Sequence, residues 1–264
     1  PRLSGRTAQL TKAESPGPVF SKLLPRTSDT AKMLYLLYFL LSFALFVLLL
    51  IAGMNVYDAL IHTFSTAGTG GFSSYNSSIA AFGSPAIEWI IAVFMMLFGI
   101  NFTLYFYLLR KEVKPVLKNE ELRVYLGIVV LATLGITFTV LPQFPNFHDA
   151  IRASFFQTTA IISTTGFMTA DFDVWPIIAK TIIICLMIIG GCAGSTGGGF
   201  KVSRVIMLVK DAIRDIKVAI HPRKVAVVRM DGKPVQENVI INLGGFLFLY
   251  VMMELGGALL LSLD

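Results

Sequence analysis

Five long apolar stretches, separated by polar segments, dominate the hydrophobic pattern of the chain. A helix that crosses a bilayer needs roughly 20 mostly apolar residues, so the pattern predicts spans at Met33–Met54, Ala86–Leu109, Val124–Leu141, Val174–Gly199 and Val239–Leu261. Charged residues make up only 14% of the 264 residues, against about 25% in an average soluble domain. We therefore expect an all-α membrane protein, with the lipid bilayer as its first partner.

Lysine and arginine are distributed unevenly among the polar segments. They gather before the first span, after the second, and between the fourth and fifth, whereas residues 55–88 carry none and residues 142–176 only Arg152. Because basic loops stay on the cytoplasmic side, this alternation predicts a cytoplasmic N-terminus and two cytoplasmic basic loops. The net charge of +6 thus reports topology, and no nucleic-acid partner is expected.

The two segments left on the outer side resemble each other. Residues 55–72 and residues 146–167 both begin with Asn-x-x-Asp-Ala-aliphatic and end with Thr-x-Gly-Phe. Each copy lies between two predicted spans, so the repeating unit is a span, a short helix, a loop and a second span. An asparagine followed by an aspartate three positions later favours a helix start, because both side chains suit the free amides there.

The two predicted short helices are Val56–Thr66 and Phe147–Ile161. At 1.5 Å per residue each would reach at most about 25 Å. Because they are short and polar, we interpret them as re-entrant pore helices that do not cross the bilayer.

The non-helical Thr-x-Gly-Phe after each pore helix predicts a cation filter. Backbone without regular structure is tolerated at membrane depth where it lines a watery cavity, and potassium-channel filters use carbonyl oxygens from Thr-Val-Gly-Tyr-Gly. An ordinary extracellular turn is the alternative, which the duplication makes less favourable. The predicted potassium ligands are Thr69, Gly70, Gly71, Thr164, Thr165 and Gly166.

The fourth span ends in a glycine run that is a poor helix interior, because each glycine costs up to about 1 kcal/mol relative to alanine. A nucleotide P-loop is disfavoured, since Phe200 separates Gly199 from Lys201 and Val202 follows. Close helix packing through small residues remains an alternative. We favour an intramembrane gating loop under the filter, formed by Gly191, Gly194, Ser195, Thr196, Gly197, Gly198 and Gly199.

A few polar residues within or beside the spans need separate interpretation. Asn101 and Thr103 are expected to form interhelical hydrogen bonds, and Arg152 a salt bridge with Asp149. For Glu254, in the last span, a functional role and a packing hydrogen bond both stay open. No nucleophile–base arrangement is evident, so we expect neither an enzyme nor a cofactor.

Four motifs together resemble the Trk-type potassium uptake proteins, which belong with the Ktr and HKT transporters. They are Asp29-Thr-Ala-Lys32, Ala52-Gly-Met-Asn55, Gly70-Gly-Phe-Ser73 and the glycine run Gly190–Gly199. The resemblance covers essentially the whole chain, and the glycine run is its most specific part.

The resemblance implies a potassium-channel-like fold of four span–pore helix–span units around one pore. One glycine of each unit sits in the filter, here Gly71 and Gly166. It also implies a homodimer in the bacterial inner membrane and a cytosolic, nucleotide-binding, TrkA-like regulatory subunit. Basic loops such as Lys210–Lys233 are the candidate contacts for that subunit.

Only two filter units are present, so we expect the chain to hold the second and third units and the start of the fourth. Two units cannot enclose a pore, and conduction would belong to the parent protein. The predicted division is a cytoplasmic basic segment 1–32, a unit 33–109, a cytoplasmic loop 110–122, a unit 123–200 ending in the gating loop, a cytoplasmic basic linker 201–237, and the first span of a truncated unit 238–264.

The leading hypothesis is potassium uptake across the plasma membrane by passive permeation through this filter. A sodium-permissive or mixed cation pathway is the alternative within transport. A non-conducting membrane scaffold, in which the glycines serve helix packing, is the alternative from another class.

Overall fold

The computed structural model describes residues 27–221 and 226–262, and almost all of its regular structure is helical. Most of the predicted basic segment 1–32 lies outside the described residues. The helices, in chain order, are α2 (Thr27–Ile51), α3 (Val56–Ala67), η1 (Ser78–Phe82), α4 (Pro85–Phe98), α5 (Phe102–Leu109), α6 (Val113–Lys118), α7 (Glu120–Val140), η2 (Leu141–Gln143), α8 (Phe147–Ile162), η3 (Phe172–Val174), α9 (Ile177–Ile189), α10 (Val202–Ile220) and α11 (Glu237–Leu261).

The chain divides into two compact units between Lys201 and Val202. The unit Ser21–Lys201 contains both predicted filter segments and the glycine run. In the second, α10 and α11 pack together beside a short antiparallel pair, β1 (Arg229–Met230) and β2 (Lys233–Pro234). The finer six-part division stays a prediction.

Three of the five predicted spans are single helices of sufficient length and hydrophobicity, at Asp29–Ile51, Glu120–Gln143 and Glu237–Leu261. The other two are not single long helices: one differs from prediction, and the other leaves the helix at the glycine run, where the sequence predicts a break. The expected continuous span Ala86–Leu109 is broken into α4 and α5, which are bent by 93°. The expected span Val174–Gly199 is helical only over Ile177–Ile189, because the chain leaves the helix at Gly190 with a φ of +74°.

The two short helices form close to the predicted bounds. In α3 the Asn55 side chain accepts a hydrogen bond from the Asp58 amide at 2.8 Å, so this cap is confirmed. In α8 the equivalent Asn146 makes no such bond. Its amide nitrogen instead lies 3.4 Å from an Asp149 carboxylate oxygen, so the expectation of a second asparagine cap was wrong.

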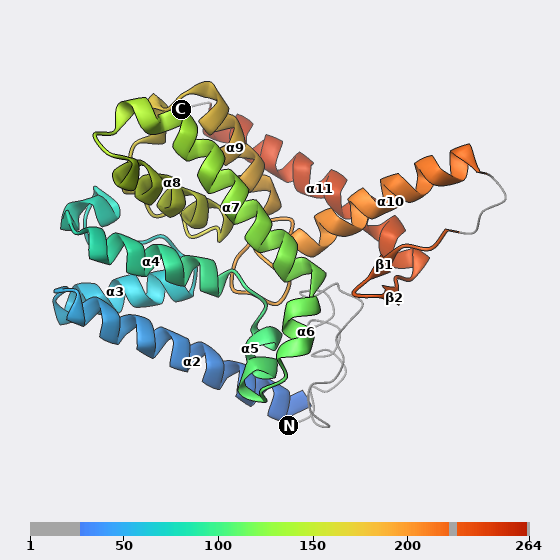
Figure 1. Ribbon diagram of the computed structural model, residues 1–264, viewed down its shortest axis with the longest axis horizontal. Helices are drawn as coiled ribbons and strands as arrows, with labels where there is room; N and C mark the ends of the chain where they lie inside the picture. The colour runs from blue at the N-terminus through green and yellow to red at the C-terminus, as the bar shows by residue number, and fades with distance from the viewer. Residues whose placement is uncertain (1–26, 222–225, 263–264) are drawn as a thin grey trace. The chain divides into compact units, whose positions relative to one another are not determined.

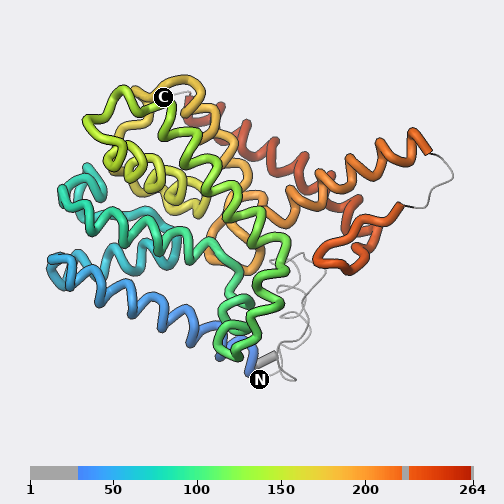
Figure 2. The backbone as a smooth tube through the Cα atoms, in the orientation of Figure 1, coloured from blue at the N-terminus to red at the C-terminus, as the bar shows by residue number. Residues whose placement is uncertain are grey.

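The pore-helix candidates α3 and α8 are held among longer helices. Helix α3 packs against α2 and α4, and α8 packs against α4, α7 and α9. Helix α4 therefore lies between α3 and α8, as the ribbon and the chain trace both show (Figures 1 and 2). This arrangement brings the C-terminal end of α3 toward that of α8, which lies about 95 residues later in the sequence.

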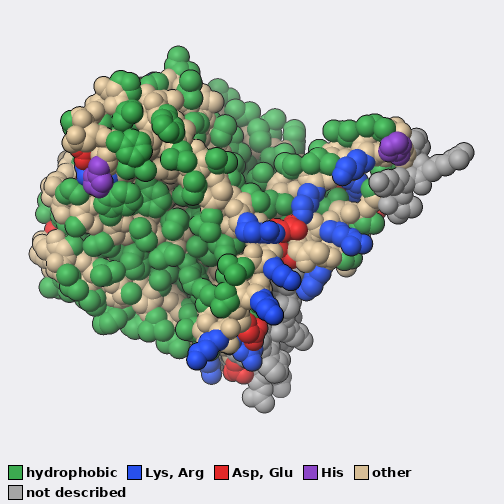
Figure 3. Space-filling model, viewed as in Figure 1, with side chains coloured by type: hydrophobic (Ala, Val, Ile, Leu, Met, Phe, Trp, Pro, Cys, Tyr) green, Lys and Arg blue, Asp and Glu red, His purple; other side chains and the backbone are tan. Residues whose placement is uncertain are grey.

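Apolar side chains fill two clusters around these helices. One joins α2, α3, α4 and α5 with Phe156, Ala160 and Phe167. The other joins α7, α8 and α9 around Ile136, Trp175 and Ile183. Large apolar side chains also cover the outside, as on the face of the Ser21–Lys201 unit seen in Figure 3. Such a surface suits lipid, since exposed apolar patches of this extent are unusual in water.

Candidate functional site

The two Thr-x-Gly-Phe segments have the same backbone conformation. Thr69 and Thr164 both have positive φ, at 51° and 59°, and so do Gly71 and Gly166, at 68° and 80°. A positive φ is uncommon for a residue other than glycine, so its occurrence at equivalent threonines is specific. Gly70 and Thr165, the residues between each threonine and its glycine, do not have a positive φ. A backbone whose φ alternates in sign in this way turns successive carbonyl oxygens to one side, as a carbonyl-lined filter requires.

The amides of these segments are bonded to the helices that precede them. The Gly70 amide donates to the Ser65 carbonyl at 2.7 Å, and the Thr165 amide donates to the Ala160 carbonyl at 3.0 Å. Ser65 and Ala160 occupy the same position, four residues before the filter threonine. The last carbonyls of each helix, which have no partner within it, thus orient the filter backbone.

The carbonyl oxygens of the same segments, unlike the amides, lack hydrogen-bond partners among the described residues. Within residues 27–221 and 226–262, none of the six carbonyls from Thr69–Gly71 and Thr164–Gly166 accepts a hydrogen bond. An unpaired carbonyl away from water is costly. These six oxygens are consequently available to coordinate a dehydrated cation.

The two segments lie against each other. A Cβ atom added to Gly71 would fall 2.1 Å from the Thr165 carbonyl oxygen, so no larger residue fits there. At Gly166 an added Cβ would meet nothing within 4 Å, yet its φ of +80° still favours glycine. The structure thus brings Gly71 of the first segment against Thr165 and Gly166 of the second.

The glycine run forms a loop that contacts both filter threonines. The Gly198 amide donates to Thr164 Oγ1 at 2.6 Å. The single hydrogen of the Thr69 hydroxyl is shared between its neighbour's carbonyl, at Gly68, 2.8 Å away, and the Thr196 carbonyl of the loop, 3.2 Å away. The approach is close enough that a Cβ on Gly197 would lie 2.9 Å from the Ser163 carbonyl oxygen. The small residues of the loop are therefore required by its contact with the filter segments.

The remaining residues of the predicted gating loop shape the loop itself. Ser195 Oγ donates to the Cys192 carbonyl at 2.7 Å, and a Cβ on Gly191 would lie 3.0 Å from Ser195 Oγ. Gly194 and Gly199 have φ of +72° and +78°. The loop closes on itself at Gly199, where an added Cβ would lie 2.6 Å from Gly190 Cα.

The same loop fills the break between α4 and α5. The amides of Cys192 and Thr196 donate to the carbonyls of Gly99 and Phe98, at 2.9 and 3.3 Å, and the Phe102 amide donates to the Gly194 carbonyl at 3.0 Å. A broken helix exposes backbone groups that must be satisfied inside the protein. The loop supplies those partners, so the break and the loop are one hydrogen-bonded structure.

Two charged side chains hold the loop from its sides. Glu121, at the start of α7 and buried, accepts a hydrogen bond from the Ala193 amide at 2.7 Å. Lys201 Nζ donates to the Gly197 carbonyl. Because bonds to ionised groups are among the stronger hydrogen bonds, these two contacts position the first and the second half of the loop.

The family described as TrkH, cation transport protein, matches residues 1–262 of the chain. The chain belongs to this family. Curated TrkH relatives include the Trk system potassium uptake proteins of Salmonella typhimurium and Escherichia coli, 37% and 38% identical over 250 residues. Each alignment covers 92% of this chain and 51% of the relative.

The fold is also that of a solved member of the TrkH family. The crystal structure of the potassium transporter TrkH from Vibrio parahaemolyticus matches with a TM-score of 0.83 and 35% identity, covering 92% of this chain and 53% of that one. The family resemblance and the all-α membrane fold predicted from the sequence are therefore confirmed. This TrkH-family chain is a multi-pass membrane protein that spans about half the length of the curated relatives it matches.

Sequence reasoning missed several residues of this TrkH-family site. Asn101 was expected to link helices, but its side chain accepts from the Thr103 amide at 2.9 Å and caps α5. The pairing of Glu121 with Ala193 joins residues 72 positions apart, and no local pattern announces it. A signal for the α4–α5 break did exist, namely Gly99 followed by the helix-capping Asn101.

The N-terminal end of α3 is fixed by a buried carboxylate. Asp58 accepts hydrogen bonds from Ser74 Oγ at 2.5 Å, Asn55 Nδ2 at 2.6 Å and Tyr75 Oη at 3.1 Å. These bonds, that from Ser74 foremost, lower the pKa of the Asp58 carboxyl below its ordinary value. Asp58 thus remains ionised and ties the segment after the filter to the start of α3.

An ion pair joins the second pore helix to α4. Arg152 lies 2.9 Å from an Asp149 oxygen, as predicted, and its Nε also lies 2.8 Å from a Glu88 oxygen. The Glu88 contact was not foreseen.

In the last span, Glu254 is hydrogen-bonded to Tyr250, one turn earlier.

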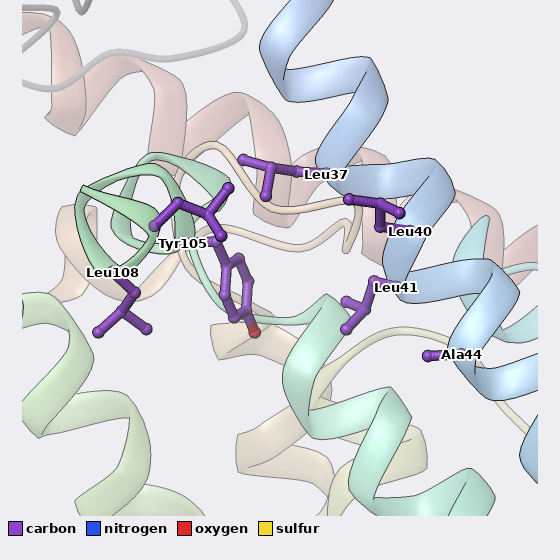
Figure 4. A pocket seen from close by; sticks show the side chains of 7 residues that line it. Leu37, Leu40, Leu41, Ala44, Tyr105 and Leu108 are labelled. Carbon is purple, nitrogen blue, oxygen red and sulfur yellow. The ribbon is translucent and has the colours of Figure 1, made fainter. Parts of the chain in front are cut away.

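A shallow groove between α2 and α5 is chemically unlike the filter. Its lining is aliphatic apart from Tyr105 (Figure 4). The Tyr105 hydroxyl is already used, because it donates to the Leu97 carbonyl at 2.7 Å. The lining of this groove therefore has no free polar group that could coordinate a cation. The candidate ion pathway lies at the predicted filter segments instead.

Proposed function

We propose that the full-length protein carries out potassium uptake across the plasma membrane by passive permeation. The filter would include Thr69–Gly71 and Thr164–Gly166, with matching segments from units outside this chain. Membership of a cation transport family supports the proposal, as do relatives that are potassium uptake proteins.

The observation that carries the proposal is the paired arrangement of unbonded carbonyls. A potassium ion must exchange its hydration shell for protein oxygens, and rows of backbone carbonyls provide such oxygens. Here every amide of the two segments except that of Gly71 donates to the preceding short helix, while the six carbonyls accept no hydrogen bond from the described part of the chain. The partly negative C-terminal ends of α3 and α8 adjoin the same oxygens and favour a cation.

The glycine loop Gly191–Gly199 is proposed as the gate. Its contacts with Thr69 and Thr164 place it directly against both filter segments. Each of these two contacts is one hydrogen bond, worth on the order of 1 kcal/mol net. The loop also bonds to Glu121 and to the α4–α5 break, so its release must break several hydrogen bonds together.

The filter is tested by Gly71→Asp and Gly166→Asp in the full-length protein, expressed in a host that lacks potassium uptake. We expect loss of growth at low potassium for both variants. Gly83→Asp is the matched control, since Gly83 also has a positive φ, +56°, but lies at an exposed turn. Normal growth with both filter variants would refute the filter.

A sodium-permissive pathway is distinguished by competition. Rubidium uptake by the full-length protein should be inhibited strongly by potassium and weakly by sodium. Equal inhibition by both ions would favour the mixed pathway. A glycine occupies the filter position of each unit here, at Gly71 and Gly166, and the family resemblance associates this residue with potassium.

A non-conducting scaffold is distinguished at the loop. Gly197→Ala would place a methyl group 2.9 Å from the Ser163 carbonyl oxygen, and Gly198→Ala would place one 3.2 Å from Thr164 Oγ1. For a gate we expect both substitutions to change rubidium flux. A scaffold would leave flux absent in every variant, the parent included.

The location and the assembly complete the proposal. The charge alternation favours an orientation with the N-terminal side of this chain in the cytoplasm, and the family resemblance implies the bacterial inner membrane. We propose a homodimer and a TrkA-like nucleotide-binding regulatory subunit that contacts the basic stretch Lys210–Lys233. Cross-linking of the full-length protein in membranes, with and without that subunit, tests both.

A further inference from the structure

His62 is a buried polar residue in the first pore helix, seven positions before Thr69. Its Nδ1 lies 2.7 Å from the Asp58 carbonyl oxygen and its Nε2 lies 2.9 Å from Ser73 Oγ. A carbonyl oxygen only accepts, so Nδ1 carries a hydrogen, and in the neutral ring Nε2 accepts from the Ser73 hydroxyl. That hydroxyl in turn accepts from the Tyr75 amide at 3.2 Å. The imidazole is thus bonded at both ends.

The ring of His62 also contacts the second filter unit. Its centroid lies 5.7 Å from that of Phe167, the residue after the filter glycine Gly166, and 5.2 Å from that of Phe82. Phe167 is buried, whereas Phe72, its equivalent in the first unit, is 77% exposed. One side chain therefore touches the exits of both filter segments, Ser73 by a hydrogen bond and Phe167 by ring contact.

The second pore helix carries a polar side chain at the equivalent position. Gln157, seven residues before Thr164, is buried, and its Nε2 donates to the Ala170 carbonyl at 3.1 Å. It also holds the segment that follows its own filter. The repeat thus places a buried hydrogen-bonding residue at the same depth in both units, independently of the His62 contacts.

We propose that His62 is a positioning residue that sets the spacing between the two filter segments and thereby the discrimination between potassium and sodium. The proposal rests on the proposed filter function. A filter distinguishes the two ions through the positions and number of its oxygens, and Gly71 packs so closely on Thr165 that an added Cβ would lie 2.1 Å from the Thr165 carbonyl oxygen. His62 contacts the chain at Ser73, two residues beyond Gly71, and at Phe167, one residue beyond Gly166.

The experiment measures rubidium uptake by the full-length protein, with potassium and sodium as competitors. We expect His62→Ala to reduce the preference for potassium over sodium by about tenfold, the effect of losing one buried hydrogen bond. His62→Gln should retain most of it, because glutamine performs the equivalent task at position 157. His148→Ala is the matched control, since this histidine lies on the second pore helix with an exposed side chain, and it should leave the preference unchanged.

A merely structural histidine gives another result. Its loss would lower the amount of folded protein in the membrane while the ion preference per molecule stayed constant, and that outcome would overturn the proposal. If His62→Ala does not accumulate, Ser73→Ala and Phe167→Leu test the two contacts separately, and an unchanged preference in both refutes it. Failure of the filter itself is recognised separately, because Gly71→Asp would then leave uptake intact.

Discussion

Thr164 Oγ1 accepts a hydrogen bond from the Gly198 amide at 2.6 Å, so a filter side chain is bonded directly to the glycine loop. The equivalent Thr69 hydroxyl contacts the Thr196 carbonyl. One threonine accepts from the loop and the other donates to it. The filter and the loop therefore share their hydrogen bonds, which predicts that a change in either alters the other.

Thr164→Val removes the acceptor while keeping the shape of the side chain. The amide of Gly198, an exposed residue, then loses its protein partner, at a cost on the order of 1 kcal/mol. We expect the loop to be displaced more often and rubidium leak from proteoliposomes of the full-length protein to rise at least about fivefold. Thr181→Val, whose hydroxyl bonds only within α9, should leave the leak unchanged. Equal leak in both variants would contradict the link.

Glu121→Ala removes the carboxylate that accepts from the Ala193 amide. The anchored half of the loop loses a charge-assisted bond, worth about 1.5–3 kcal/mol, so we expect the loop to be displaced more often and rubidium leak from proteoliposomes to rise about tenfold or more. Glu121→Gln keeps an acceptor and should raise the leak less. Glu120→Ala, which removes the neighbouring carboxylate, is the control. An equal rise for alanine at positions 120 and 121 would show that the effect is not specific to the loop contact.

Arg152→Ala breaks the ion pair between α8 and α4. Both Arg152 and Glu88 have side chains less than 20% exposed, so we expect a loss of about 1–2 kcal/mol in the free energy of unfolding. The exposed pair of Arg110 and Glu112, at 3.7 Å, supplies the control. Arg110→Ala should cost less than about 0.5 kcal/mol. Thermal unfolding in detergent measures both, and a larger shift for Arg110→Ala would refute this assignment.

Gly99→Ala tests the packing at the α4–α5 break. An added Cβ would lie 2.3 Å from the Tyr125 hydroxyl oxygen, which itself donates to the Met96 carbonyl at 3.0 Å. We expect the free energy of unfolding to fall by about 1–3 kcal/mol, the usual cost of overpacking. The yield of monodisperse protein should fall with it. Tyr125→Phe removes that oxygen, so the double variant should recover part of the loss. No recovery would place the strain elsewhere.

The repeat in the sequence was enough to predict the two short helices, and it singled out the two Thr-x-Gly-Phe segments, whose role as a filter stays a prediction. Asn55, Asp58, Thr69 and Gly71 belong to local patterns whose meaning depends on a few neighbouring residues. The break at Gly99 was missed because hydropathy continues through it, and a single glycine does not end a helix in an apolar stretch. Its partners come from the loop around Gly194.

Charged partners were the hardest to predict. Arg152 was assigned to Asp149, three residues away, because spacing within a helix is visible in a sequence. Glu88 and Glu121 act on residues that only the fold brings near, at separations of 64 and 72 positions. Such pairings are set by helix packing, which the order of hydrophobic residues along the chain does not encode.

Under the gating function proposed above, the bonding of the glycine loop into the α4–α5 break would tie ion access to hydration. When the loop withdraws, the carbonyls of Phe98 and Gly99 lose the amides of Thr196 and Cys192 at a depth where lipid offers no substitute. Water must enter to solvate them. Unblocking the route and wetting its inner wall are thus a single event, and dehydrating conditions such as high osmotic pressure should hold the route shut.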